Sequence, residues 1–123
     1  MSVRKQIAAE FETAWRDVPA LAGLRVIATE RALDDIREPT ALIRAKSYDI
    51  TPEAPNSHRN VGLLLTVISH FTDLERAGDA LDDLVPAVLD YLDTRYQHDK
   101  ADAVAYNDRL AYDIPFTVIA SKE

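Results

Sequence analysis

The chain opens with an apolar stripe that predicts a helix. Apolar side chains recur there at spacings of three and four residues, which places them on one face of a helix. The stripe consists of Val3, Ile7, Phe11, Ala14, Trp15 and Val18. Pro19 predicts the end of this helix, because the residue before a proline avoids the helical conformation.

Three segments that follow have the patterns of strands. Residues 24–29 (LRVIAT) are short and β-branched in the middle. Residues 40–50 (TALIRAKSYDI) alternate small or apolar side chains with partly charged ones, as in a strand with one solvated face. Residues 60–71 (NVGLLLTVISHF) are apolar on both rows, which predicts a central strand. The polar segment 30–39 reads as a loop, and the short connection 51–59 predicts an antiparallel hairpin.

A second helix is predicted in the acidic part of the chain. Residues 72–75 (TDLE) fit the capping-box pattern that starts a helix. The apolar stripe beyond them consists of Leu81, Leu84, Val85, Val88, Leu89 and Leu92. Pro86 removes a backbone hydrogen bond from this helix. We therefore expect a weak first turn and a firm helix from Asp82 or Asp83 to about Arg95.

The last apolar pattern predicts a final strand over residues 109–120 (RLAYDIPFTVIA). Its alternating apolar side is formed by Leu110, Tyr112, Ile114, Phe116 and Val118. Pro115 suggests an edge position or a bulge, since proline cannot donate to a neighbouring strand. The preceding residues 96–108 (YQHDKADAVAYND) lack a clean period and read as a loop.

These elements predict one α+β domain over residues 1–123. The expected order is α-β-β-β-α-β, with a four-stranded, mainly antiparallel sheet and two helices packed on one of its faces. A chain of this size is long enough to bury a single core.

Composition narrows the classes of function. The formal net charge is −7, which argues against a surface built to bind DNA through its phosphates. The absence of cysteine excludes disulfides and thiolate metal sites. The first residues mix charged and apolar groups, so no signal peptide is expected. The longest apolar run, residues 61–69, is too short to cross a bilayer as a helix. We expect a soluble acidic protein of a reducing compartment.

The segment TPEAPNSHRN, residues 51–60, is the first candidate for chemistry. Ser57 and His58 are adjacent, and neighbours on an extended backbone point to opposite sides, so they do not form a nucleophile and its base. No nucleophile-elbow motif surrounds Ser57. The three histidines make no closely spaced metal-binding pair. A proline-stiffened, exposed hairpin tip is the favoured interpretation, and no catalytic residue is assigned.

Acidic side chains of the second helix are the next candidate. At about 100° per residue they fall within roughly 100° of arc, opposite the apolar stripe. They are Asp79, Asp82, Asp83, Asp90 and Asp93. Such a cluster fits divalent cations or, more simply, the solvated face of an amphipathic helix, which we favour. The three isolated glycines exclude phosphate-binding loops. No metal site, no cofactor and no enzymatic activity are therefore expected.

The element order, together with the segments PTALIR, ALDDLVPAVLDYLD and LAYDIPFTVIA, resembles the tail terminator proteins of long-tailed bacteriophages. The resemblance extends over essentially the whole chain. It implies a ring of identical subunits, usually a hexamer, that ends polymerisation of the tail tube. The implied partners are other copies of the chain, the tail tube protein and the head–tail connector protein. Direct sequence-specific contact with nucleic acid and contact with a membrane are not implied.

The same resemblance implies a location in the tail or neck of the virion, and in the host cytoplasm during assembly. Other neck or head-completion proteins of this architecture remain alternatives. A non-catalytic adaptor that binds another protein, and a small enzyme with a site assembled from loops, are further alternatives.

The hairpin of residues 40–71 is long enough to reach a neighbouring subunit. Its charged residues either guard an exposed edge or meet the acidic helix of the next copy. The expected contact residues are Arg44, Lys46, Glu53, Asn56, His58, Arg59, Asp82, Asp83 and Asp90.

Overall fold

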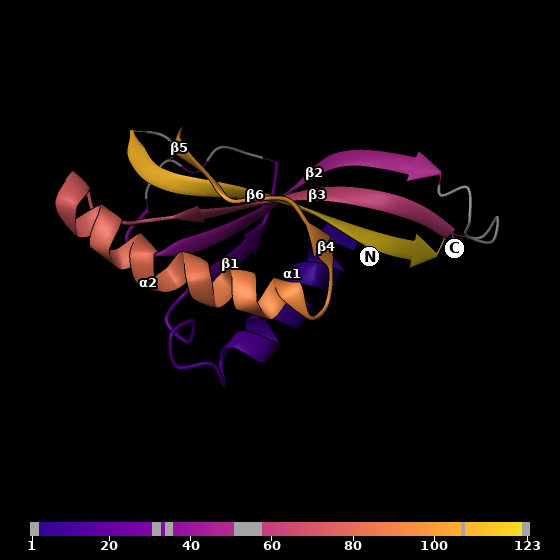
Figure 1. Ribbon diagram of the computed structural model, residues 1–123, viewed down its shortest axis with the longest axis horizontal. Coiled ribbons are helices and arrows are strands. Elements are labelled where there is room, and N and C mark those ends of the chain that lie inside the picture. The colour runs from indigo at the N-terminus through magenta and orange to yellow at the C-terminus, as the bar shows by residue number, and fades with distance from the viewer. Residues whose placement is uncertain (1–2, 31–32, 34–35, 51–57, 107, 122–123) are drawn as a thin grey trace.

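The fold combines two helices with six strands, as a computed structural model shows (Figure 1). The structure describes residues 3–30, 33, 36–50, 58–106 and 108–121. Along the chain the elements are α1 (Val3–Trp15), β1 (Arg25–Ala28), β2 (Thr40–Ile50), β3 (His58–Ile68), α2 (Leu74–Asp93), β4 (Gln97–His98), β5 (Asp102–Tyr106) and β6 (Arg109–Ser121).

The six strands form one mixed sheet. Its order is β1-β2-β3-β6-β4, and β5 also pairs with β6. β1 is parallel to β2, and the other pairs are antiparallel. The α+β class, the antiparallel hairpin of β2 and β3 and the central place of β3 are confirmed. The prediction of four strands in the order α-β-β-β-α-β is wrong, because two more strands lie between α2 and β6.

Both additional strands lie in the segment predicted as a loop. β4 has only two residues, and β5 has five, of which three are exposed. Strands this short bury too few side chains to give an alternating pattern. Each is held by pairing with β6, β4 at Phe116 and Thr117 and β5 along residues 109–113. Pairing with β6 therefore determines their extended conformation, and the pattern of their own side chains does not.

Pro115 explains why the two short strands are separate. β6 is not an edge strand, as the proline suggested, because β3 pairs with residues 111–121 on one side and β4 and β5 pair with it on the other. The carbonyl of Pro115 accepts a hydrogen bond from the Asp99 amide at 2.9 Å, so this residue's backbone faces the connection between β4 and β5. A residue's N–H and C=O point to the same side of a strand. Pro115 has no N–H to donate, and it lies opposite the connection between β4 and β5, where no strand needs that donor.

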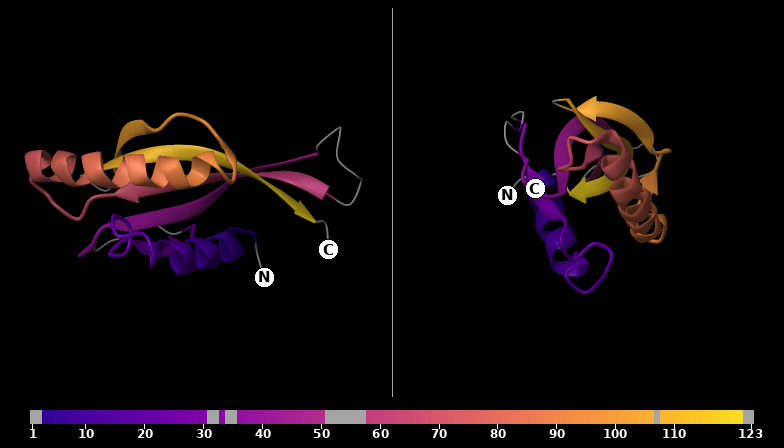
Figure 2. Two further views of the ribbon diagram at one scale, coloured as in Figure 1. Left: turned by 60° about the horizontal axis from the view of Figure 1, so that its bottom comes forward. Right: turned by 90° about the vertical axis from the view of Figure 1, so that its left-hand side faces the viewer.

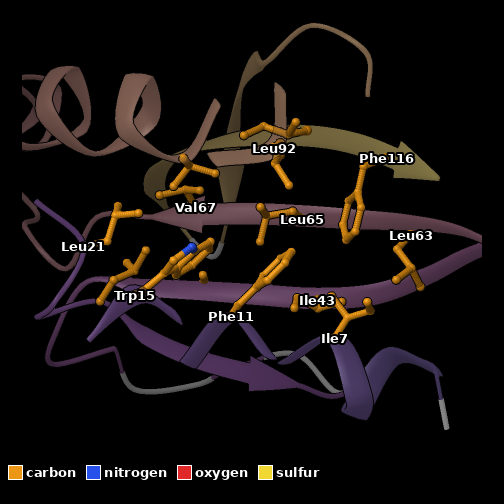
Figure 3. Close-up of a cluster of buried hydrophobic side chains, with 14 of the residues drawn as sticks. Ile7, Phe11, Trp15, Leu21, Ile43, Leu63, Leu65, Val67, Leu92 and Phe116 are labelled. Atoms are coloured by element: carbon orange, nitrogen blue, oxygen red, sulfur yellow. The ribbon is translucent and has the colours of Figure 1, made fainter. Parts of the chain in front are cut away.

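Both helices pack on the same face of the sheet and share one core (Figures 2 and 3). Phe11 lies at its centre and is fully buried. Its ring stacks on Trp15 at 4.8 Å and meets Tyr91 edge-on at 5.4 Å. Phe116 reaches the same cluster from β6, at 5.9 Å from the Phe11 ring. The apolar stripes predicted for the two helices therefore pack against each other and against the sheet.

The opposite face of the sheet carries a second, smaller core. Ile36, Leu42, Ile68 and Ala111 are buried there. Leu33 packs against this core, and its amide donates to the Tyr106 hydroxyl at 2.8 Å. The segment predicted as a polar loop thus covers part of the face that the β2 pattern predicted to be solvated.

α2 is one continuous helix from Leu74 to Asp93, with Pro86 inside it. Asp73 is the N-cap, and its side chain accepts a hydrogen bond from the Glu75 amide at 3.2 Å. The prediction that the firm helix starts only near Asp82 is therefore wrong. Pro86 is exposed, so the weakened backbone hydrogen bonding faces solvent, while the opposite face packs in the core.

Candidate subunit interface

The main candidate for an interface is an arm formed by three strands. We call "the arm" residues 44–50 of β2, 58–64 of β3 and 115–121 of β6, which are in register with one another. The ends of these strands lie at one end of the long axis, beyond both helices (Figures 1 and 2). A register shift between Ala45 and Ser47 marks the start of the arm on β2, and irregularities of this kind increase strand twist.

Both edges of the arm are open within the described residues. β1 pairs with β2 only as far as Ile43. The next free donor, the Ala45 amide, is taken by a Glu30 carboxylate oxygen at 3.1 Å, which lowers the pKa of Glu30. On the other side, β4 pairs with β6 at Phe116 and Thr117 and not beyond. Unpaired strand edges of this kind are templates for pairing with another chain.

Arg44 belongs to a polar row that crosses the face of the sheet opposite the helices. Its guanidinium donates to the Thr66 hydroxyl at 2.9 Å, and this hydroxyl donates to Asp113 at 2.7 Å. The guanidinium also lies over the Tyr106 ring, 5.7 Å from its centroid. Thr66 is fully buried. The structure therefore engages Arg44 within its own chain.

Lys46 is exposed and lines a hollow of about 570 Å³. Gly62 and Thr117 of the arm also line this hollow, together with β4 and the end of α2. The position of Lys46 leaves its ammonium group accessible to a partner, in contrast to Arg44.

His98 also lines this hollow, and both of its ring nitrogens lie close to oxygen atoms. Its Nε2 lies 2.6 Å from Asp93 Oδ1, and its Nδ1 lies 2.8 Å from the Asp99 carbonyl oxygen. The carbonyl of Asp99, followed by the carboxylate of Asp93, raises the pKa of His98. Only the imidazolium form donates to both oxygens. This arrangement favours the protonated form of His98 and joins α2 to β4.

The acidic residues Asp82, Asp83 and Asp90 lie on the exposed side of α2. α2 covers one face of the sheet, whereas the row that contains Arg44 crosses the other. Within one chain these two groups are not brought together. Lys46, in contrast, lines the same hollow as Asp93, the last residue of α2, so Lys46 and the end of the acidic helix are neighbours within one chain.

Two of the remaining predicted contact residues begin β3, and two fall outside the described residues. His58 and Arg59 are the first residues of β3, in register with Ser121 and Ala120. Glu53 and Asn56 fall outside the described residues, as do Ser57 and the prolines of the predicted tip.

Sequence reasoning missed the joint between Asp93 and His98. The two residues are five apart and lie on either side of the helix end, so no helical or strand spacing relates them. The sequence showed only that an acidic helix end is followed by a polar segment that contains a histidine.

Two further findings concern metals and membranes. Within residues 3–30, 33, 36–50, 58–106 and 108–121, no group of three or more histidine or acidic side chains is arranged to hold a metal ion. The described helices include none that is long and apolar enough to cross a membrane.

Comparison with known proteins leaves the family open. The sequence matches no protein family and is similar to no curated protein.

Proposed function

We propose that this protein is a structural protein of a bacteriophage virion. In this proposal, copies of the chain form a ring, most simply a hexamer, that caps the tail tube, ends its polymerisation and joins the tail to the head connector. The observation that carries the proposal is the arm, whose two open strand edges project beyond the helices. A surface of this kind suits association with other chains.

The chemistry of the described residues agrees with a role in assembly. His98 has both ring nitrogens engaged, and Arg44 is bound to Thr66. In the hollow that Lys46 and His98 line, the histidine is already held by Asp93 and Asp99. On these contacts we assign neither residue the role of a nucleophile or a general base. We infer a non-enzymatic protein that works through its surfaces and requires no cofactor.

The proposal is tested by adding the purified chain to growing tail tubes. We expect rings in native mass spectrometry, and tubes capped at one end in electron micrographs. Tubes that lengthen at an unchanged rate and carry no cap would contradict the tail-terminator assignment. Binding to the head connector in the absence of any tube binding would select the sister function in the neck instead.

The arm tip is tested separately by replacing residues 53–59 with a short Gly-Ser turn. We expect the fold to persist, because none of the core residues of the helices and the sheet belongs to residues 53–59, and we expect ring formation and capping to weaken. Circular dichroism and thermal unfolding report on the fold. Glu12→Ser, on the exposed side of α1, is the control. Unchanged capping by the variant would show that the tip is only a turn.

The same open edges also fit an adaptor that binds an extended segment of another protein by strand addition. This second candidate predicts a monomer that ignores tail tubes and binds a peptide along β2 or β6. Protection of the Ile119 amide from hydrogen exchange on peptide binding would favour it, since alternation from Pro115 turns this amide to the side of β4.

A further inference from the structure

Two large hydrophobic side chains are exposed among the described residues, and they belong to opposite ends of the molecule. Leu74 is 69% exposed and Ile119 is 61% exposed. Leu74 is the first residue of α2, which begins at one end of the long axis, whereas β6, which carries Ile119, ends at the other (Figure 1). Exposed apolar groups next to open strand edges are typical of protein–protein contacts.

Leu74 borders a shallow, mostly apolar hollow of about 350 Å³. Its apolar lining consists of Leu74, Ala103, Val104, Ala105 and Leu110. Three of these residues belong to β5, which pairs with β6 on one side only within the described residues. This end of the molecule thus presents an apolar hollow beside an open strand edge of five residues.

Ile119 lies at the other end of the molecule, on the end of β6. Beyond Thr117, residues 118–121 of β6 have no strand partner on the side of β4 among the residues that the structure describes. A hollow of about 420 Å³ adjoins this edge and is lined by Arg95, Tyr96 and Val118 among others. The open edge of β6 and the open edge of β5 are similar in length, so one can pair along the other.

The charges at the two ends are also complementary. The hollow at Ile119 is lined by the cation Arg95, and none of its described lining residues is acidic. The hollow at Leu74 includes Asp108 and Arg109. Arg109 is partly buried and donates to the His70 carbonyl at 2.6 Å within its own chain, whereas Asp108 is exposed. A cation at one end and an anion at the other favour contact between different ends of two copies.

We propose that the free edge of β6 around Ile119 docks on the β5 edge and the Leu74 hollow of a second copy. The contact is head-to-tail, because the two surfaces differ and neither is complementary to itself. Repeated contacts of this kind give a ring if the rotation between copies closes, and an open filament if it does not. This inference rests on the proposed function for the existence of a ring. It adds the two surfaces through which the ring would form.

The chain contains no cysteine, which makes disulfide trapping a direct test. Leu74→Cys and Ile119→Cys are made singly and together, and oxidised under conditions in which the wild-type chain associates. We expect a covalent dimer when the two single variants are mixed, and a ladder ending in a closed ring for the double variant. Each single variant alone stays uncrosslinked. Asp83→Cys, exposed in the middle of α2, replaces Leu74→Cys as the control and gives no crosslink with Ile119→Cys.

A single variant that crosslinks to itself would overturn the proposal, because it would show a two-fold contact. A wild-type chain that stays monomeric both alone and with tail tubes would also overturn it. Capped tubes without a crosslink between positions 74 and 119 would uphold the tail-capping function and overturn this contact. A crosslinked ladder without capping would uphold the contact and overturn the tail-capping function.

Lysine substitutions give an independent readout. Ile119→Lys and Leu74→Lys each place a charge in the proposed contact, and we expect each to weaken association about tenfold or more. Both positions are exposed, so the thermal unfolding of the subunit should not change. Thr72→Lys, an exposed residue just before α2, is the control for the added charge. Association that is equally strong in all of these variants would overturn the proposal.

Discussion

Arg44 and Asp113 are joined across the sheet through the hydroxyl of Thr66, although their strands are not neighbours. β3 lies between β2 and β6, and Thr66 on β3 accepts from Arg44 at 2.9 Å and donates to Asp113 at 2.7 Å. The two charged groups themselves are 3.9 Å apart. One buried hydroxyl therefore satisfies a cation and an anion at the same time.

Replacing Thr66 by valine keeps the shape of the side chain and removes this bridge. We expect a loss of about 1–3 kcal/mol in the free energy of unfolding, because both charged partners lose a hydrogen bond at a buried position. The midpoint of urea unfolding measures the loss, with an unchanged slope. Thr72→Val, on an exposed threonine, is the matched control. Equal midpoints for the two variants would show that the row contributes little.

Phe11→Ala removes the ring at the centre of the main core. We expect a loss of about 3–5 kcal/mol in the free energy of unfolding, as for other buried aromatic side chains. Phe11 is fully buried and contacts rings from α2 and β6. Glu12→Ala, the exposed neighbour, should change stability by less than about 0.5 kcal/mol. A small loss for Phe11→Ala would mean that the helices and the sheet do not share this core in solution.

The joint between His98 and Asp93 predicts a dependence of stability on pH. The folded-state pKa of His98 lies above its unfolded value of about 6.5, so its contribution is fully present below that pH. It is lost as the pH rises through the raised folded-state pKa. His98→Gln should therefore lower stability by about 0.5–1 kcal/mol near pH 6 and much less near pH 9, a modest effect because Asp93 is 58% exposed.

Urea unfolding of both chains across this pH range checks the prediction. Asp93→Asn, which keeps the shape and removes the charge, should also destabilise the folded state more near pH 6 than near pH 9. A difference between wild type and His98→Gln that does not change with pH would show that His98 is not held as a cation.

Pro86→Ala should stabilise the protein. The alanine restores an N–H donor for the carbonyl of Asp82, four residues earlier in α2, and removes the clash of the proline ring. Part of this gain is offset because the unfolded chain becomes more flexible, which leaves a net effect of about 1–2 kcal/mol. Differential scanning calorimetry should show a higher melting temperature. A lower one would mean that the packing of α2 depends on the bend that proline introduces.

Sequence patterns predicted the elements that bury a continuous face. The stripe of Ile7, Phe11 and Trp15 in α1 is buried as predicted, and the alternating apolar side of β6 packs in the same core. β3 is apolar on both faces because each face of the sheet has its own core, which its central place requires.

The elements that were missed depend on partners that a local pattern does not contain. β4 and β5 are strands because β6 offers them an edge, and their own side chains are half exposed. Leu33 and Ile36 cover the second core from a segment whose charges dominate its pattern. At the candidate interface, alternation placed Arg44 and Lys46 on one row. It did not reveal that Arg44 is bound to Thr66 while Lys46 is exposed.

The central place of β3 has a consequence for synthesis on the ribosome. β2 is its partner in a local hairpin, whereas β6, which covers its other edge, follows α2, β4 and β5 along the chain. In a nascent chain, the second edge of the apolar strand β3 therefore stays unpaired while all of α2 is being synthesised. Truncation before residue 109 would leave that edge open permanently. Such fragments should aggregate, and the full chain should need β6 before its slowest folding step can finish.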